Sequence, residues 1–251
     1  MPPSRLKLAA IDLDGTLLSH DLTISPENLQ AIRTLHQRGV AIAIASGRHY
    51  LSVKQFLQSL SEVQWIVSVQ GGEIANRDRT LILARDFMQP AHVELTVDQA
   101  TRLGLTPIVY GTDGVFTHLP ENENLAYYQH LSGLTPVQTS RENLARMPVF
   151  KVLWAGQPDQ ISAVLAAPPL SPDFDRVRTH SRTVEFMPNG ITKATGLQTL
   201  ATHLKISPAD AVVFGDADND IPMFQWAGLS VAMAHGWPTA LARAINAILD
   251  R

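Results

Sequence analysis

The chain has 251 residues, of which 45% are hydrophobic and 17% charged, and its formal net charge is −3. This composition predicts a soluble globular protein with a substantial core, built as one large domain or two smaller ones. The small negative charge argues against non-specific binding to nucleic acid, and the absence of cysteine excludes disulfides, thiolate metal sites and cysteine nucleophiles.

The apolar runs of the chain are too short to cross a membrane, and residues 40–45 form one of the longest. Near the N-terminus, Asp12 interrupts the apolar run that follows Arg5 and Lys7, so no signal peptide is expected. We therefore expect a cytoplasmic protein without a membrane partner. No pattern in the sequence specifies an oligomeric state.

The first predicted element is a buried strand over residues 6–11, which ends in two carboxylates. Asp12 and Asp14 are two positions apart, so in an extended segment their side chains project to the same side, about 7 Å from each other. Gly15 then allows the backbone to turn. An ordinary Asp-Gly turn after a strand has the same pattern, so this stretch alone does not distinguish a catalytic pair from a turn.

Helices and strands alternate after this stretch. Ser25 is a predicted N-cap, Pro26 is the first helical residue, and Ile24 with Leu29 forms a hydrophobic staple. Gly39 ends that helix. A strand, a helix and another strand follow over residues 40–45, 49–60 and 65–69. This order is typical of a parallel sheet with crossover helices.

The pattern changes over residues 82–186. A hairpin is predicted over residues 108–116, around a Gly-Thr-Asp-Gly turn. A helix, a strand, a second helix and a second strand follow over residues 124–131, 149–154, 159–166 and 176–186. We interpret this segment as a small α+β domain inserted into the parallel pattern.

The parallel pattern resumes at residue 187. Thr192 is a predicted N-cap for a helix that continues to about residue 204. A strand over residues 211–214 is followed by a short helix through Met223, Phe224 and Trp226. A last strand over residues 229–234 and a closing helix over residues 239–250 complete the pattern. The predicted fold class is α/β: residues 1–81 and 187–251 form a Rossmann-like core, a parallel sheet with helices on both faces, and residues 82–186 form the smaller inserted domain.

Polar side chains follow several of the predicted parallel strands at their carboxyl ends, which is the edge where open α/β sheets bind ligands. These residues are Asp12, Asp14, Ser46, Asp216, Asn219 and Asp220. Lys193 lies near the start of a helix, where backbone N–H groups and the helix dipole also favour an anion.

This set of side chains suits phosphoryl transfer. A carboxylate that attacks a phosphate meets repulsion between like charges, and Lys193 can supply positive charge against it. Oxygen atoms of Asp12, Asp216 and the segment around Asp14 can hold Mg²⁺, which prefers hard oxygen ligands. Asp14 can protonate a leaving oxygen and later deprotonate the attacking water, and Ser46 with nearby N–H groups can hold phosphate oxygens.

Four segments, in this order, resemble the motifs of the haloacid dehalogenase superfamily of phosphatases, in its Cof-type branch. Residues 12–16, Asp-Leu-Asp-Gly-Thr, resemble the first motif, and Ser-Gly-Arg at residues 46–48 resembles the second. Lys193 within residues 189–193 resembles the third motif, and residues 215–223 resemble the fourth. The resemblance covers essentially the whole chain, and the first and fourth motifs are highly specific in this combination.

The resemblance implies a role for each matching residue. Asp12 would be the nucleophile that becomes an aspartyl-phosphate, and Asp14 would be the general acid and base. The ligands of Mg²⁺ would be Asp12, the backbone carbonyl of Asp14, and Asp216, while Asp220 would act behind them or through water. The residues that bind phosphate and substrate would be Ser46, Gly47, Arg48, Lys193 and Asn219.

The resemblance also implies the activity: a Mg²⁺-dependent phosphatase for a small phosphate monoester. A sugar phosphate is the default substrate, and nucleotides, flavin mononucleotide and pyridoxal phosphate remain open. Residues 82–186 would form a cap that closes over the site, excludes water and selects the leaving group.

Two segments depart from the family pattern. Gln70-Gly71-Gly72 stands where relatives usually carry Asn-Gly-Ala after the third strand. Residues 233–236, Met-Ala-His-Gly, stand where relatives usually carry Met-Gly-Asn-Ala. Neither segment holds the nucleophile or the principal metal ligands, so the departures affect the assignment of a specific substrate and not the chemistry.

Each of these residues also has an interpretation without chemistry. Residues 216–220 can form an acidic turn with a helix N-cap, Lys193 can be a solvated helix residue, and Ser46 can be a turn residue. Arg48 can contact substrate or form a surface salt bridge. For the whole chain, the alternatives are a phosphomutase of similar fold and a catalytically silent binding or regulatory domain. Four retained residues speak against the silent domain: Asp12, Asp14, Lys193 and Asp216.

Overall fold

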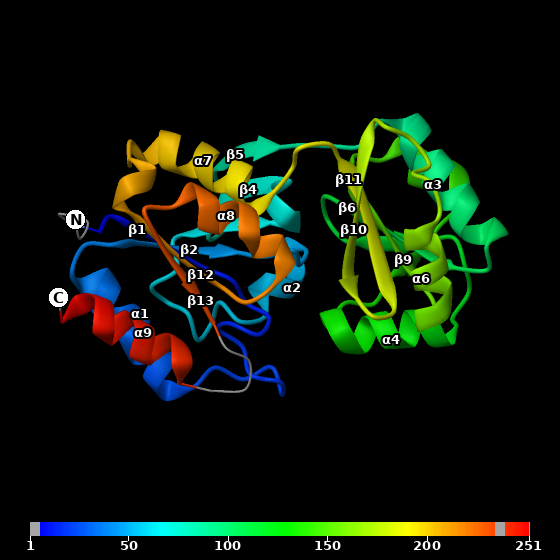
Figure 1. The fold of residues 1–251 in the computed structure, drawn as a ribbon. Helices are drawn as coiled ribbons and strands as arrows, with labels where there is room; N and C mark the ends of the chain where they lie inside the picture. Colours follow the sequence, from blue (N-terminus) through cyan, green and yellow to red (C-terminus); the bar gives the residue numbers. More distant parts are fainter. Residues whose placement is uncertain (1–5, 234–238, 251) are drawn as a thin grey trace. The chain divides into compact units, whose positions relative to one another are not determined.

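The chain folds into two compact units. The computed structural model describes residues 6–233 and 239–250 (Figure 1). One unit comprises Met1–Arg85 with Thr192–Arg251, and the other comprises Asp86–Ile191. The sequence prediction places both boundaries a few residues earlier, after residues 81 and 186. They lie later because residues 82–85 pair with the sheet of the first unit and residues 183–188 form one strand of the second.

Within the described residues, the first unit contains a mixed seven-stranded sheet in the order β13-β12-β1-β2-β3-β4-β5. Its strands are β1 (Leu8–Ile11), β2 (Ala41–Ala45), β3 (Trp65–Ser68), β4 (Glu73–Asn76), β5 (Ile82–Arg85), β12 (Ala211–Gly215) and β13 (Leu229–Ala232). The strands from β13 to β3 are parallel, as predicted. β4 and β5 extend one edge in antiparallel pairing, which the sequence analysis did not predict.

Helices cover both faces of this sheet, as predicted. α1 (Pro26–Gln37), α2 (Tyr50–Lys54) and α9 (Ala240–Leu249) pack on one face, and α7 (Lys193–Leu204) and α8 (Ile221–Trp226) pack on the other (Figure 1). Along β1, Ala9 and Ile11 contact the α1 and α9 side, whereas Leu8 and Ala10 contact the α7 side. Because side chains alternate along a strand, residue 12 is directed toward the α7 side.

Side-chain caps begin two of these helices, as the sequence predicts. The Ser25 hydroxyl accepts a hydrogen bond from the Asn28 backbone N–H at 3.2 Å, and Pro26 is the first residue of α1. At the start of α7, the Thr192 hydroxyl accepts from the Thr195 backbone N–H at 3.2 Å. Each cap satisfies a backbone donor that the first turn of a helix leaves free.

Small residues let α7 pack close to the sheet. The sheet residues beneath it include Ala10, Ala43 and Ala45. Gly196 lies on the facing side of α7, and a Cβ at that position would come within 2.5 Å of Cγ1 of Val67. This close packing brings Lys193, the first residue of α7, to the edge where β1 ends.

Within the described residues, the second unit contains a six-stranded sheet in the order β10-β11-β9-β6-β7-β8. Its strands are β6 (Thr106–Gly111), β7 (Val115–Thr117), β8 (Val137–Gln138), β9 (Val149–Ala155), β10 (Phe174–His180) and β11 (Thr183–Pro188). Its helices are α3 (Pro90–Arg102), α4 (Glu123–Ser132), α5 (Arg141–Arg146) and α6 (Pro158–Ala166). One apolar core joins a face of this sheet to α3, α5 and α6. The unit has the α+β composition that the sequence predicts.

Two predicted elements are wrong in detail. The single strand predicted over residues 176–186 is a hairpin of β10 and β11, whose turn at Ser181 and Arg182 carries no Gly, Pro or Asn to mark it. The helix predicted over residues 49–60 is α-helical only to Lys54. It continues as tighter turns, and the Arg77 guanidinium donates hydrogen bonds to carbonyl oxygens there, including that of Leu60.

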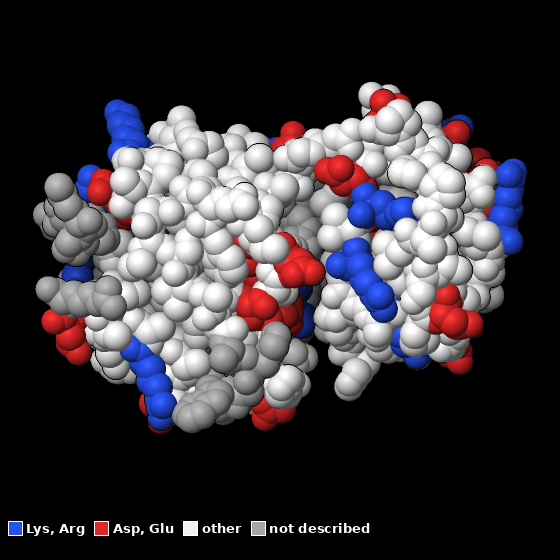
Figure 2. All heavy atoms as spheres, viewed as in Figure 1, with Lys and Arg blue, Asp and Glu red and all other residues white. Residues whose placement is uncertain are grey.

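Two further predictions concern the last strand and the absence of a membrane-spanning segment. β13 ends at Ala232, and residue 234 of the predicted strand lies outside the described residues. Across residues 6–233 and 239–250, no helix combines the length and apolar character that crossing a bilayer requires. On the face seen in Figure 2, acidic and basic side chains lie in small groups among uncharged residues.

Candidate active site

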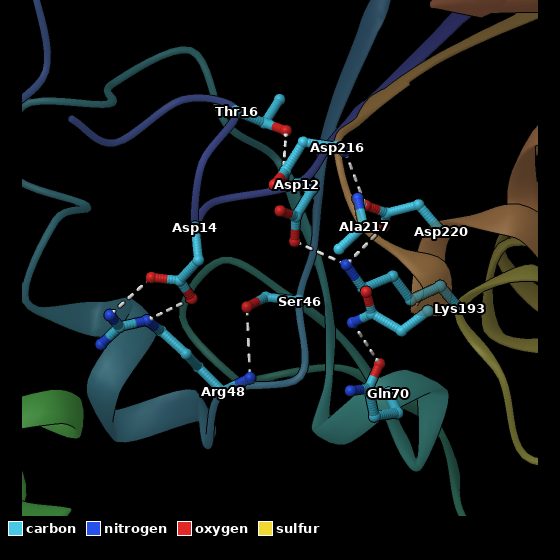
Figure 3. A network of polar contacts seen from close by, with 11 residues as sticks. Asp12, Asp14, Thr16, Ser46, Arg48, Gln70, Lys193, Asp216, Ala217 and Asp220 are labelled. Atoms are coloured by element: carbon cyan, nitrogen blue, oxygen red, sulfur yellow. Dashed lines mark hydrogen bonds and ion pairs between the residues drawn. The ribbon is translucent and has the colours of Figure 1, made fainter. Parts of the chain in front are cut away.

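The loops that carry the predicted site residues meet at the carboxyl edge of the parallel strands (Figure 3). Asp12 follows β1, Ser46 follows β2 and Asp216 follows β12, and these three strands are neighbours in the sheet. The backbone N–H of Asp12 donates to the Phe214 carbonyl at 2.9 Å, and that of Ser46 donates to the Val67 carbonyl at 2.9 Å. The sheet's hydrogen bonds therefore extend into these loops and hold their first residues in place.

Lys193 forms two buried ion pairs at this edge. Its Nζ lies 2.5 Å from Oδ1 of Asp12 and 2.6 Å from Oδ1 of Asp220. The side chains of Lys193, Asp12 and Asp220 are 1%, 7% and 0% exposed. Two carboxylates face one ammonium, so the cluster carries an excess of negative charge when all three groups are ionised.

The pKa values of this cluster follow from its burial. Burial, together with the nearby charges of Asp220 and Asp14, raises the pKa of Asp12 to about 7 against the opposing effect of Lys193. Burial alone lowers the pKa of Lys193, but attraction to Asp12 and Asp220 outweighs it and holds that pKa above its usual value. Lys193 is therefore charged at neutral pH. The second carboxylate is left without a counter-charge, which destabilises the folded protein, and a bound cation would remove that destabilisation.

Asp220 also organises the loop after β12. Its Oδ2 accepts hydrogen bonds from the backbone N–H groups of Asp216 at 2.9 Å and Ala217 at 3.1 Å. Gly215 permits this approach, since a Cβ there would lie 2.5 Å from Cγ of Asp220. One carboxylate thus holds the Asp216 loop with one oxygen and the Lys193 ammonium with the other.

Asp216 completes an acidic group. Thr16 donates from its hydroxyl to Oδ1 of Asp216 at 2.9 Å. Asp12, Asp216 and Asp220 each offer one carboxylate oxygen, and these oxygens lie within 4.8 Å of one another. A donor set of carboxylate oxygens, with an excess of negative charge, fits a hard divalent cation such as Mg²⁺.

Gly15 lies beside this acidic group and has a left-handed backbone conformation that favours glycine. Its φ is +78°, and a Cβ there would lie 2.4 Å from Oδ2 of Asp216. Gly15→Ala is expected to cost about 1–2 kcal/mol in unfolding free energy from its left-handed backbone, and also to displace Asp216 and weaken Mg²⁺ binding. Chemical unfolding and a Mg²⁺ titration measure the two effects.

Gly39 provides a matched control for that substitution. Its φ is +81°, and nothing lies within 4 Å of the place where a Cβ would be built. Gly39→Ala therefore carries the backbone strain without the collision, and we expect it to lower stability while leaving Mg²⁺ affinity unchanged. Equal Mg²⁺ affinity in both variants would contradict the proposed position of Asp216 in the cation site.

Asp14 lies against Arg48. Nε of Arg48 is 2.8 Å from Oδ2 of Asp14, and Nη2 is 2.7 Å from Oδ1, so the two side chains pair through two parallel hydrogen bonds. The Arg48 side chain is 9% exposed and that of Asp14 is 43% exposed. Of the two interpretations of Arg48, the structure therefore contains a salt bridge, but one whose arginine is largely buried. The two aspartates of the first motif have different partners, since Asp12 pairs with Lys193.

The remaining predicted phosphate-binding residues lie beside this pair. Ser46 is fully buried, and its hydroxyl accepts from the backbone N–H of Arg48 at 3.1 Å. Asn219 donates from Nδ2 to Oε1 of Gln70 at 3.2 Å. The Gln70 side chain also lies against Gly47, where a Cβ would come within 2.5 Å of Nε2.

The structure thus brings the predicted site residues to one edge of the sheet, with Asp12, Lys193, Asp216 and Asp220 in one group and Asp14 paired with Arg48 (Figure 3). Two contributors were not predicted. Thr16 is part of the first motif but was given no role, and Gln70 was noted only as a departure from the family pattern. Residues 234–236 of the second departure lie outside the described residues.

Known proteins share this fold and the sequence pattern. A model of the haloacid dehalogenase-like hydrolases matches residues 9–250. The HMP-PP phosphatase of Cronobacter sakazakii is 30% identical over 240 residues, which cover 94% of this chain and 87% of that protein. The 5-amino-6-(5-phospho-D-ribitylamino)uracil phosphatase YitU of Bacillus subtilis is 29% identical over 243 residues, which cover 91% of this chain and 87% of that protein. The crystal structure of a haloacid dehalogenase-like hydrolase from Bacteroides thetaiotaomicron superposes with a TM-score of 0.85 at 23% identity, covering 97% of this chain and 100% of that one.

Proposed function

The chain belongs to the haloacid dehalogenase-like hydrolases, in the Cof-type branch, and on this premise we propose that it hydrolyses a small phosphate monoester through a phosphoryl group carried by Asp12. The observation that supports this proposal most strongly is the buried cluster of Asp12, Lys193 and Asp220. It places a carboxylate oxygen at the end of a central strand, next to a fixed positive charge. That arrangement suits a nucleophile that must approach an anionic phosphoryl group.

Asp12 and Asp14 have separate tasks in this proposal. Asp12 attacks phosphorus, and the bond from phosphorus to the leaving oxygen breaks. Asp14 gives its proton to that oxygen, then takes a proton from the water that attacks the phosphoryl group on Asp12. The bond from phosphorus to the Asp12 oxygen then breaks, which releases phosphate and restores the carboxylate. The paired hydrogen bonds from Arg48 hold the Asp14 carboxylate in one orientation, and its partial exposure leaves it open to a leaving group.

The phosphoryl oxygens require donors around the nucleophile. Lys193 already lies within hydrogen-bond distance of Asp12, so its ammonium can contact an oxygen of the group that Asp12 attacks. We propose that the Ser46 hydroxyl and the Asn219 amide supply further donors. We propose that Gly47 also belongs to this phosphate site, because its missing side chain lets the Gln70 carboxamide approach the main chain between Ser46 and Arg48.

Mg²⁺ fits the acidic group in charge and in donor type. Asp12, Asp216 and the backbone carbonyl of Asp14 would hold the ion, with Asp220 fixing the Asp216 loop behind them. Bound there, Mg²⁺ would neutralise negative charge on the nucleophile and the phosphate. The protein's own part is to orient the ligands: Thr16 holds Asp216 and Lys193 holds Asp12.

Mg²⁺ is expected to raise the unfolding temperature of the protein. At a concentration about 100 times its dissociation constant, a ligand that binds only the folded state adds about 2.7 kcal/mol to the unfolding free energy. Asp216→Asn should abolish most of this effect, because it removes one carboxylate from the group. Thermal unfolding with and without Mg²⁺ measures it, and an equal Mg²⁺-dependent rise in the Asp216→Asn variant would rule out this site.

The substrate class follows from family and relatives, and we propose a small phosphate ester with sugar phosphates as the first candidates. The relatives named above act, by their names, on HMP-PP and on a phosphoribitylaminouracil. Both compounds therefore belong in the test alongside sugar phosphates, nucleotides, flavin mononucleotide and pyridoxal phosphate. We propose that the inserted unit, Asp86–Ile191, selects among such leaving groups.

A screen of these esters for phosphate release tests the proposed function. We expect release from at least one of them to require Mg²⁺ and to be lost in Asp12→Asn. Phosphate release without any bisphosphate activator distinguishes hydrolysis from phosphomutase activity. A folded protein that releases no phosphate from any ester in the presence of Mg²⁺ would support a binding or regulatory domain instead.

A further inference from the structure

The turn between β3 and β4 has a backbone conformation that few residues adopt. Val69, Gln70 and Gly71 have φ values of 53°, 60° and 103°, so three consecutive residues lie in the left-handed region. A branched residue such as Val69 is rarely found there, because its side chain crowds the backbone. Such strain costs about 1–3 kcal/mol per residue and persists only where surrounding contacts enforce it.

Contacts with the segment after β2 and with the start of α7 hold this turn in its conformation. The backbone N–H of Val69 donates to the Arg48 carbonyl at 3.0 Å, and that of Gln70 donates to the Ser46 carbonyl at 3.1 Å. On the other side, Gly71 packs against the start of α7, where a Cβ would come within 2.2 Å of the Thr192 carbonyl oxygen. The turn is thus held between the segment from Ser46 to Arg48 and the helix that begins with Lys193.

The conformation of the turn directs the Gln70 carboxamide into the site (Figure 3). Gln70 is 5% exposed, and its Oε1 accepts from Asn219 at 3.2 Å. Its Nε2 lies on the side of Gly47. The carboxamide therefore bridges Asn219 and Gly47, two residues to which the proposed function gives a place in phosphate binding.

Within the described residues, Nε2 of Gln70 donates no hydrogen bond. The N–H groups of Nε2 are therefore available to a ligand that enters the site beside Gly47. A phosphoryl oxygen beside Gly47 would be the missing acceptor. An amide donor suits such an oxygen because it adds a hydrogen bond without changing the charge of the site.

We propose, resting on the function proposed above, that Gln70 is a further phosphoryl-binding residue of this enzyme. Its Oε1 orients the Asn219 amide, and its Nε2 donates to an oxygen of the substrate phosphoryl group. The strained turn serves to hold both atoms of the carboxamide at the site. Because the group binds phosphate before and during the reaction alike, its loss affects KM and phosphate affinity more than kcat.

Two substitutions that keep the length of the side chain test this role. Gln70→Glu keeps an acceptor for Asn219 but replaces the donor with a charged oxygen, and Gln70→Met removes both. With Mg²⁺ present, we expect KM for p-nitrophenyl phosphate and the inhibition constant of inorganic phosphate to rise about tenfold in Gln70→Met, and further in Gln70→Glu. The kcat of both variants should stay within about threefold of the wild-type value.

Gln198→Glu is the matched control. Gln198 lies on the exposed side of α7 and accepts from Nε1 of Trp226 at 2.8 Å, so the same change is made at a glutamine that also accepts from a neighbouring side chain. Its KM and phosphate inhibition should equal those of the wild type. If Gln70→Glu does not fold, Gln70→Met decides the question, since it introduces no charge.

Unchanged KM and unchanged phosphate inhibition in a folded Gln70 variant would overturn the proposal, and a lowered melting temperature alone would assign Gln70 to the turn only. The wild-type measurement separates this outcome from failure of the proposed function. If the wild-type protein hydrolyses p-nitrophenyl phosphate, the proposed function stands whatever the result for the Gln70 variants. If it neither hydrolyses this ester nor binds phosphate, both proposals fail.

Discussion

Asp12→Asn is expected to lower kcat by about four orders of magnitude or more, because it replaces the nucleophile with an amide of the same shape. The variant should remain folded. Asn also removes the excess negative charge of the cluster, leaving Lys193 paired with Asp220 alone. Without Mg²⁺ at about pH 8, we therefore expect the variant to be more stable than the wild type, and parallel measurements of phosphate release and thermal unfolding check both expectations.

The pH dependence of that stability difference follows from the pKa of Asp12. Because burial raises this pKa from 3.8 to about 7, the folded wild type holds a proton that the unfolded chain has lost between these two values. The contribution of Asp12 to stability therefore falls as pH rises through this window, and the advantage of Asp12→Asn grows until about pH 7 and is then constant. A metal-free wild type that is more stable than the variant at high pH would contradict the excess charge that we assign to the cluster.

Lys193→Met is expected to be the most destabilising substitution in the site and to abolish turnover. It leaves the carboxylates of Asp12 and Asp220 buried without a cation, and breaking a buried pair by removing one partner costs about 3–5 kcal/mol. The pKa of Lys193 is raised, so its ion pairs stabilise the folded wild type at neutral pH. That contribution to the unfolding free energy is lost only as the pH rises above the ordinary pKa of lysine. Chemical unfolding and phosphate release measure the two effects.

Lys193→Arg and Lys54→Met serve as controls for that prediction. Arg keeps the positive charge but not the compact ammonium, so we expect it to recover much of the stability and little of the activity. Lys54 is exposed on α2, and its replacement by Met should change neither quantity. Acidification should recover part of the stability of Lys193→Met, because it neutralises Asp12. A Lys193→Met variant with wild-type stability and turnover would show that the ion pairs serve neither purpose.

Much of the fold could be predicted from the sequence because local patterns agreed with the tertiary structure. The apolar strand before Asp12, and the N-caps at Ser25 and Thr192, depend on residues close together in the chain, and the structure contains all three. The alternation of strands and helices likewise predicted the parallel centre of the sheet. The order of the polar residues after the strands then indicated one edge, since parallel strands bring their carboxyl ends together.

The features that the sequence did not predict depend on contacts between distant residues. Hydrogen bonds to residues 46 and 48 hold Val69 and Gln70 in the left-handed conformation, and the sequence around Val69 does not predict that conformation for a branched residue. The β10–β11 turn contains no Gly, Pro or Asn, so the sequence predicts a single strand where the structure has a hairpin. The pairing of Asp14 with Arg48 also depends on the fold, because separation along the chain does not specify which partner a side chain meets.

The most direct test of the account is to trap the phosphoryl group on the nucleophile. Borohydride added during turnover of the substrate identified by the screen reduces an acyl phosphate, and peptide mass spectrometry locates the product. We predict homoserine at position 12 in the wild type, none elsewhere in the chain, and none in Asp12→Asn. An enzyme that turns over under the same conditions with residue 12 unmodified, or with the modification at another residue, would contradict the assignment of Asp12 as the nucleophile.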